Sequence, residues 1–168
     1  SMSGKFAVVH NGIIENYLSV KEKLLNAGVE FTSDTDSEVI AQFLEFYYDG
    51  NILNTMSKLL KKIEGSYSLG IVCADKPDEL IAAKKASPLI IGVGKNENFI
   101  ASDVTAIVSR TKDIIRLEDE EFAIIKENNI KIYDKNKNII SKDVFHIDWD
   151  ISVAEKSGYE HFMLKEIM

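Results

Sequence analysis

The sequence contains little cysteine and little proline, with one cysteine and two prolines among 168 residues. Because Cys73 is alone, it cannot form an internal disulfide bond, which favours a reducing compartment and makes the cytoplasm the expected location. Cys73 lies among apolar residues of a strand-like segment, where a cysteine is typically a small buried side chain. We therefore do not expect it to act as a nucleophile.

Long apolar runs and an excess of basic residues are also missing. No apolar run approaches the length that crosses a bilayer, and no signal-peptide pattern opens the chain. The formal net charge is −7, and no basic stripe carries interleaved aromatic residues. These absences argue against membrane and nucleic-acid partners.

Motifs for metals and common cofactors are absent as well. His10, His146 and His161 are scattered without metal-ligand spacing, and Gly92-x-Gly94 lacks the third glycine and the helix of a dinucleotide-binding loop. There is no G-x-S-x-G sequence and no phosphate-binding loop. We expect neither a metal nor a cofactor.

The bulk composition is that of an ordinary soluble globular protein, with 45% hydrophobic and 28% charged residues. The length suits one domain or most of one. Residues 1–3 resemble a processing scar, so we assign the domain to residues 4–168. The chain begins almost at once in a core-type strand and stops inside residues 162–168 without a polar tail, so we expect both ends to be cuts through something longer.

Helical patterns dominate the first half. The first predicted helix runs from about Asn16 or Ser19 to Ala27. Ser19-x-x-Glu22 fits a capping box, and Gly28 stands where a helix-terminating glycine belongs.

Two further helices are predicted downstream. In the second helix Thr35-x-x-Glu38 fits another capping box, and Asp49 with Gly50 ends it. The third helix carries apolar residues at helical spacing over positions 53–63, and Gly65 closes it.

The second half reads as short strands separated by turn signals. Apolar residues occupy both faces of the 122–126 segment, which indicates strands covered on both sides, as in a layered sandwich. The fold class is therefore α+β, with a mostly antiparallel sheet system and a weaker pattern after position 143, where Trp149 and Phe162 are expected to attach a tail. The predicted strands are 67–74, 79–84, 89–93, 99–102, 114–117, 122–126, 130–133 and 139–140, and a short helix is predicted over 104–110.

The most informative segment is the opening, residues 6–17, in which an apolar strand-like run ends in Asn11-Gly12 and passes into a helical pattern. Asn-Gly between apolar runs is most often a two-residue hairpin turn. Here the downstream residues do not alternate as a returning strand should. An asparagine amide beside a glycine N–H can also form a two-donor pocket for an oxyanion, so turn and functional loop stay about equal on local grounds.

An acidic pair, Asp34 and Asp36, precedes the second helix. Acids at a helix N-terminus commonly stabilise the helix dipole. Because Thr35 is available as the cap, Asp36 is a candidate for binding a ligand ammonium group.

Several stretches together carry a more specific signal than any one of them. They are His10-Asn11-Gly12-Ile13-Ile14-Glu15-Asn16; Ser33-Asp34-Thr35-Asp36-Ser37-Glu38-Val39-Ile40; Gly65-Ser66-Tyr67; Ser87-Pro88-Leu89-Ile90-Ile91-Gly92; Asn98-Phe99-Ile100-Ala101-Ser102-Asp103; and His161-Phe162-Met163-Leu164-Lys165-Glu166-Ile167.

In this order the first five resemble the glutaminase domain of the class II glutamine amidotransferases, and of the glutamine–fructose-6-phosphate aminotransferases in particular. The last resembles the segment that leads out of that domain toward the sugar-phosphate half. The resemblance covers essentially everything after Ser3. It implies an N-terminal-nucleophile hydrolase fold, a four-layer sandwich of antiparallel sheets between helices, here incomplete. It also implies glutamine as substrate and, in the same polypeptide, a sugar-phosphate isomerase domain that receives ammonia and forms glucosamine 6-phosphate from fructose 6-phosphate, in a parent that is a homodimer.

The resemblance also assigns roles. In that family the N-terminal cysteine attacks the glutamine amide, with its own α-amino group as base. Asn11 and Gly12 match the oxyanion hole, and Asp36 matches the acid that holds the α-ammonium group. The cysteine would lie upstream of this chain, and Ser1 is too close to the Asn-Gly strand to replace it. We therefore expect no activity from the chain alone, and edge strands left exposed for dimerisation.

Two alternatives remain open. One is another class II amidotransferase, for example one that serves purine or asparagine synthesis, although the Ile-Ile-Glu-Asn continuation speaks against it. The other is a binding or regulatory module that kept the sandwich and lost catalysis.

Overall fold

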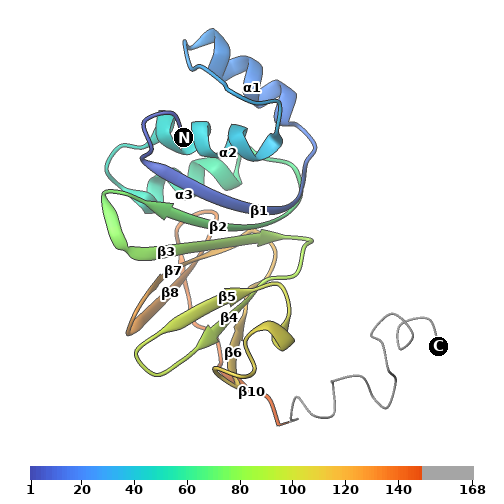
Figure 1. The fold of residues 1–168 in the computed structure, drawn as a ribbon, viewed down its shortest axis with the longest axis vertical. Helices are drawn as coiled ribbons and strands as arrows, with labels where there is room; N and C mark the ends of the chain where they lie inside the picture. The colour runs from blue at the N-terminus through green and yellow to red at the C-terminus, as the bar shows by residue number, and fades with distance from the viewer. Residues whose placement is uncertain (149–168) are drawn as a thin grey trace, which may run out of the picture.

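The computed structural model describes residues 1–148, which form three stacked layers (Figure 1). Helices cover one face of a six-stranded sheet, and a four-stranded sheet covers part of the other face. The helical elements are α1 (Tyr17–Asn26), α2 (Asp36–Tyr47), α3 (Ile52–Leu60) and the short 3-10 turn η1 (Val104–Ala106).

Both sheets are antiparallel throughout. The larger has the order β1-β2-β3-β7-β8-β9 and the smaller β10-β6-β4-β5. Their strands are β1 (Phe6–Ile14), β2 (Gly65–Cys73), β3 (Lys76–Lys85), β4 (Ile90–Val93), β5 (Asn98–Ala101), β6 (Asp113–Arg116), β7 (Glu121–Lys126), β8 (Asn129–Asp134), β9 (Ile139–Ile140) and β10 (Phe145–His146).

The centre of the larger sheet is buried on both faces. On β3, Ile81 and Ala83 belong to the core that includes α2 and α3, whereas Ala82 belongs to the core between the sheets. Successive side chains of a strand point to opposite faces, so one short apolar run serves two cores. This confirms the predicted α+β sandwich, and three of its layers lie within the described residues.

The helix ends follow local chemistry. Gly28 takes a φ of +87° and donates to the Leu25 carbonyl, while the Val29 N–H bonds back to the Leu24 carbonyl. This pair of bonds is a Schellman motif, so Gly28 ends α1 as its sequence position predicted.

The capping box predicted for α1 is wrong. α1 begins at Tyr17 after Asn16, which places Ser19 inside the helix. The Asn16 amide is used elsewhere, because it donates to the Lys62 carbonyl and accepts from the Glu64 N–H. Asn16 therefore joins the start of α1 to the segment before β2.

The capping box predicted for α2 is half right. The Thr35 hydroxyl accepts from the Glu38 N–H at 3.3 Å. The Glu38 carboxylate does not return to Thr35 and instead accepts from the backbone N–H groups of Thr32 and Ser33. Burial alone would raise the pKa of Glu38, but the hydrogen bonds from Ser33 and Thr32 lower it to about 2. Glu38 thus holds the loop before α2 in place.

Two other predicted boundaries are wrong, and one strand was not predicted. Gly65 does not close a helix, because it is the first residue of β2 with a φ of +122°. The predicted 104–110 helix is only the 3-10 turn at 104–106. β10 pairs with β6 where no strand was predicted, since its two residues are too few to produce a pattern.

The remaining expectations have mixed outcomes. Cys73 is buried and free, as predicted. The terminal ammonium of Ser1 donates to the Phe6 carbonyl, a contact that does not test whether residues 1–3 belong to the domain. No helix between residues 1 and 148 is long and apolar enough to cross a membrane. Trp149, His161 and Phe162 lie outside the described residues.

Candidate functional site

Asn11 and Gly12 lie inside β1, not at its end. β1 continues to Ile14 and pairs with β2 in unbroken register, with Asn11 opposite Ser68 and Gly12 opposite Tyr67. The prediction that the strand stops at Asn-Gly is therefore wrong, and so is the hairpin alternative. The chain turns only after Ile14, where it enters α1.

The Gly12 N–H points away from β2. Just beyond the two ends of β1, the Ala74 N–H donates to the Lys5 carbonyl and the Glu15 N–H donates to the Glu64 carbonyl. Lys5 and Glu15, both odd-numbered, are therefore in hydrogen-bonded pairs. Hydrogen-bonded and non-hydrogen-bonded pairs alternate along an antiparallel ladder, so the odd-numbered residues of β1 bond to β2. Gly12, an even-numbered residue, directs its N–H to the outer edge, where β1 has no neighbouring strand among the described residues.

Gly12 is required by the backbone as well as available for chemistry. Its φ is +129°, a conformation that L side chains rarely adopt. A Cβ atom at this position would overlap the carbonyl oxygen of Ser66 on β2. Packing alone therefore accounts for a glycine here, whatever its N–H does.

The Asn11 side chain lies on the face of β1 opposite the helices. It lines a hollow of about 220 Å³ between the β1–β2 pair and the end of β5. Ser68, Gly70, Ile100 and Ser102 also line it, so polar groups lie beside apolar walls. Asn11 thus presents an amide to an open space close to the edge at which the Gly12 N–H emerges.

Asp36 lies at the same outer edge, at the first position of α2. Its Oδ2 accepts from the Ile14 N–H at 2.9 Å. The sequence suggested a carboxylate free to bind a ligand, whereas one of its oxygens already has a donor within the chain. Oδ1 accepts from the Ser37 hydroxyl at 3.4 Å. A carboxylate has about four lone-pair positions, and its side chain is 23% exposed, so Asp36 keeps the capacity to accept from a ligand.

His10 reaches this cluster from the helix-facing side of β1. Its side chain is 2% exposed, with Nδ1 3.0 Å from the Ser37 hydroxyl and 3.7 Å from Asp36 Oδ1. Burial lowers the pKa of His10, and the Asp36 charge opposes this in part. His10 is part of the first stretch that carries the family resemblance, but the sequence alone indicates no role for its side chain. The signal that sequence reasoning missed is that adjacent strand residues face opposite ways, which places His10 and Asn11 on either side of β1.

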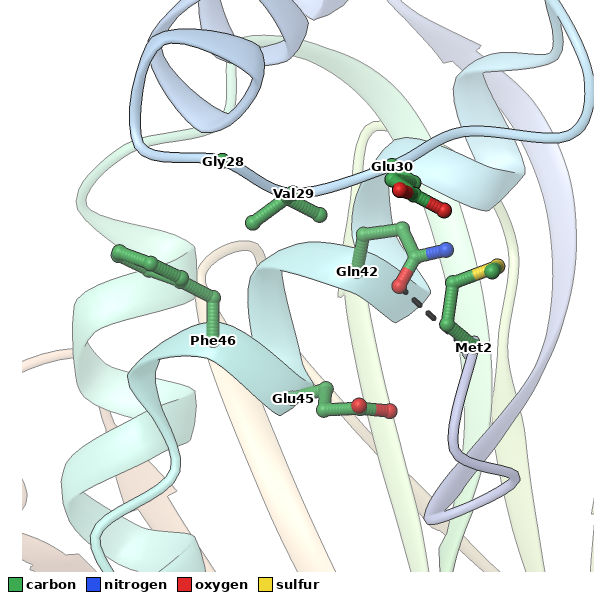
Figure 2. A pocket seen from close by; sticks show the side chains of 7 residues that line it. All are labelled: Met2, Gly28, Val29, Glu30, Gln42, Glu45 and Phe46. Atoms are coloured by element: carbon green, nitrogen blue, oxygen red, sulfur yellow. Dashed lines mark hydrogen bonds between the residues drawn. The ribbon is translucent and has the colours of Figure 1, made fainter.

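A larger hollow, of about 390 Å³, lies over α2 and shares no lining residue with the first one. Figure 2 shows Phe46, Glu45 and Gln42 of α2 facing the loop after α1 and Met2. The backbone of Met2 donates to Gln42 Oε1 at 3.3 Å. Within residues 1–148 no group of three or more acidic, histidine or cysteine side chains could hold a metal ion.

The Glutamine amidotransferase domain family matches residues 1–109, which carry α1, α2, β1 and the strands that flank the hollow. The chain belongs to this family. Glutamine–fructose-6-phosphate aminotransferase [isomerizing] of Caldanaerobacter subterraneus subsp. tengcongensis is 52% identical over 99% of the chain, and that of Aquifex aeolicus is 48% identical over 98%. The chain spans 28% of the length of each of these two relatives.

A solved structure supports the fold assignment. Glutamine phosphoribosylpyrophosphate amidotransferase from B. subtilis matches 83% of the chain and 31% of its own length, with a TM-score of 0.70 and 25% identity. Together with the sheet order, this confirms the predicted type of N-terminal-nucleophile amidotransferase sandwich. The roles predicted for Asn11, Gly12 and Asp36 stay predictions.

Proposed function

We propose that this chain is part of the glutamine-hydrolysing unit of a glutamine–fructose-6-phosphate aminotransferase. The observation that carries the proposal is the outer edge of β1. There the Gly12 N–H, which has no hydrogen-bond partner among residues 1–148, lies next to the Asn11 amide and two residues before Ile14, whose N–H holds the carboxylate of Asp36.

The spacing along this edge suits an amino acid with a terminal amide. Gly12 and Ile14 are two residues apart, so their N–H groups are separated by about 7 Å along the strand. The Gly12 N–H would donate to the amide oxygen, and Asp36, anchored at Ile14, would accept from the α-ammonium group. Glutamine carries these two groups at opposite ends of a short aliphatic chain.

Each group has a definite task in this proposal. When a nucleophile attacks the glutamine amide, charge develops on the carbonyl oxygen, and the Asn11 amide and the Gly12 N–H stabilise it. Asp36 fixes the substrate through a charge-assisted hydrogen bond. Cys73 is buried at the end of β2 and cannot reach a substrate as the nucleophile. We therefore propose that the attacking cysteine belongs to a part of the full-length enzyme that this chain does not contain.

The percentages of identical residues favour the aminotransferase over a purine-pathway enzyme. Over the aligned residues, this chain is 48–52% identical to the two named aminotransferases, against 25% for the phosphoribosylpyrophosphate amidotransferase. We accordingly propose a sugar-phosphate isomerase domain in the same polypeptide that consumes the ammonia, and a cytoplasmic homodimer.

Replacement of Asn11 in the full-length aminotransferase tests the proposal. We expect Asn11→Ala to lower kcat for glutamine hydrolysis by about 10²–10³-fold, as loss of one oxyanion donor does. Asn128, exposed in the turn between β7 and β8, provides the control Asn128→Ala, for which we expect an unchanged rate. Equal rates for Asn11→Ala and the wild type would contradict the assignment.

A further inference from the structure

We infer that His10 is a positioning residue for the glutamine α-ammonium group, acting through Ser37 on the carboxylate of Asp36. This inference rests on the proposed function of Asp36. It assigns to the buried face of β1 a part in substrate binding, while the exposed face supplies Asn11.

The hydrogen-bonding pattern gives the direction of this chain of contacts. Burial lowers the pKa of His10 and so favours the neutral ring, which carries a single proton. Its Nε2 is buried and has no hydrogen-bond partner among the described residues. Buried N–H groups are left without a partner more rarely than buried carbonyl acceptors, so a bare lone pair is the less costly state for the buried Nε2. We therefore assign the single proton to Nδ1.

With the proton on Nδ1, the order of the contacts is fixed. His10 Nδ1–H donates to the Ser37 hydroxyl at 3.0 Å, and that hydroxyl donates to Asp36 Oδ1. The other oxygen of Asp36 accepts from the Ile14 N–H. The carboxylate is thus held from two sides by β1, once through the main chain and once through His10.

This arrangement determines where the remaining lone pairs of Asp36 point. Without the His10 contact, the Ser37 hydroxyl can rotate and Oδ1 loses its fixed donor, while the Ile14 bond remains. The effect of removing His10 is then on substrate affinity more than on the chemical step, because the Asn11 amide and the Gly12 N–H are unchanged.

The test uses three substitutions of His10 in the full-length enzyme. His10→Leu removes the donor, and we expect KM for glutamine to rise about tenfold with kcat within a factor of about three, as loss of a bond worth about 1.4 kcal/mol would give. His10→Asn places an amide N–H near the position of Nδ1 and should restore KM to within about threefold. His10→Gln places its amide nearer the position of Nε2 and should not restore it.

A double mutant separates this inference from the proposed function. If Asp36→Asn alone leaves KM unchanged, the proposed function fails. If Asp36→Asn raises KM, the double mutant His10→Leu/Asp36→Asn should show the KM of Asp36→Asn alone, because His10 acts through Asp36. Full additivity of the two effects, or an unchanged KM in His10→Leu, would overturn the role of His10.

A second histidine–aspartate pair supplies the matched control. His146 Nδ1 lies 2.6 Å from Asp113 Oδ1 where β10 pairs with β6, away from the edge of β1, and both side chains are at least half exposed. His146→Leu should leave KM unchanged. Thermal unfolding of each variant shows whether His10→Leu is folded, and His10→Asn keeps the test decisive if it is not.

Discussion

β1 and β3 belong to the same sheet but have opposite surroundings. β3 pairs with a strand on each side, and its Ile81 is 0% exposed. Within the part of the chain that the structure describes, β1 pairs on one side only, and its Val9 and Ile13 are 68% and 66% exposed. The centre of the sheet is therefore built for packing, whereas its edge combines unpaired backbone groups, a hollow and an anchored carboxylate. Proteins normally cover a strand edge with unpaired N–H and C=O groups. We therefore propose that the substrate binds at this edge.

The largest expected effect on stability comes from comparing an alanine substitution on β3 with one on β1. Ile81→Ala should lower the free energy of unfolding by about 3 kcal/mol, because it leaves a cavity between β3 and the helices. Ile13→Ala should lower it by about 0.5 kcal/mol or less, since that side chain is largely in water. Urea denaturation of both variants measures the difference, and equal losses would show that β1 is covered in solution.

A second contrast concerns two glycines with positive φ. Gly12→Ala should cost more than about 2 kcal/mol, because the added Cβ overlaps the Ser66 carbonyl in addition to the backbone strain. Gly50, with a φ of +86° and nothing within 4 Å of an added Cβ, is the control. Gly50→Ala should cost about 1 kcal/mol. Equal costs would mean that β1 and β2 are not as close at Gly12 as the structure has them.

The smallest effect depends on pH and lies at the loop beside the site. The pKa of Glu38 is about 2 in the folded chain, below its ordinary value of 4.5, so its contribution to stability is present above about pH 4.5 and is lost as the pH falls toward 2. Glu38→Gln should therefore cost about 1 kcal/mol at pH 7, since bonds to a charged group are lost, and almost nothing near pH 2.

Glu22→Gln provides the control for Glu38. Glu22 is exposed on α1, and the capping box predicted for it is not formed. We expect no change of stability with this substitution at either pH. A cost for Glu38→Gln that does not vary with pH would contradict the assigned hydrogen bonds.

Local chemistry decided which features could be predicted from the sequence. Gly28 after a helical run and Thr35 before one carry their signals in neighbouring residues, and both caps are present. The predictions from Ser19 and Gly65 are wrong because contacts between distant segments set those boundaries. The Asn16 amide bonds to Lys62 at the start of α1, and Gly65 pairs with β1.

The same reasoning applies to the candidate site. The residue types of Asn11, Gly12 and Asp36 were evident from the sequence and the family resemblance. Strand register determines three other features of the site. The Gly12 N–H points to the outer edge, the Ile14 N–H donates to Asp36, and His10 lies within hydrogen-bonding distance of Ser37 beside Asp36. Register is set by the partner strand more than fifty residues away, and no local pattern contains it.

The most direct test is a crystal structure of the full-length aminotransferase with the product L-glutamate bound. We expect one side-chain carboxylate oxygen of the ligand to accept from Asn11 Nδ2 and the Gly12 N–H, and its α-ammonium group to contact Asp36. Glutamate bound with the Gly12 N–H unengaged and its ammonium group on another acid would contradict the account.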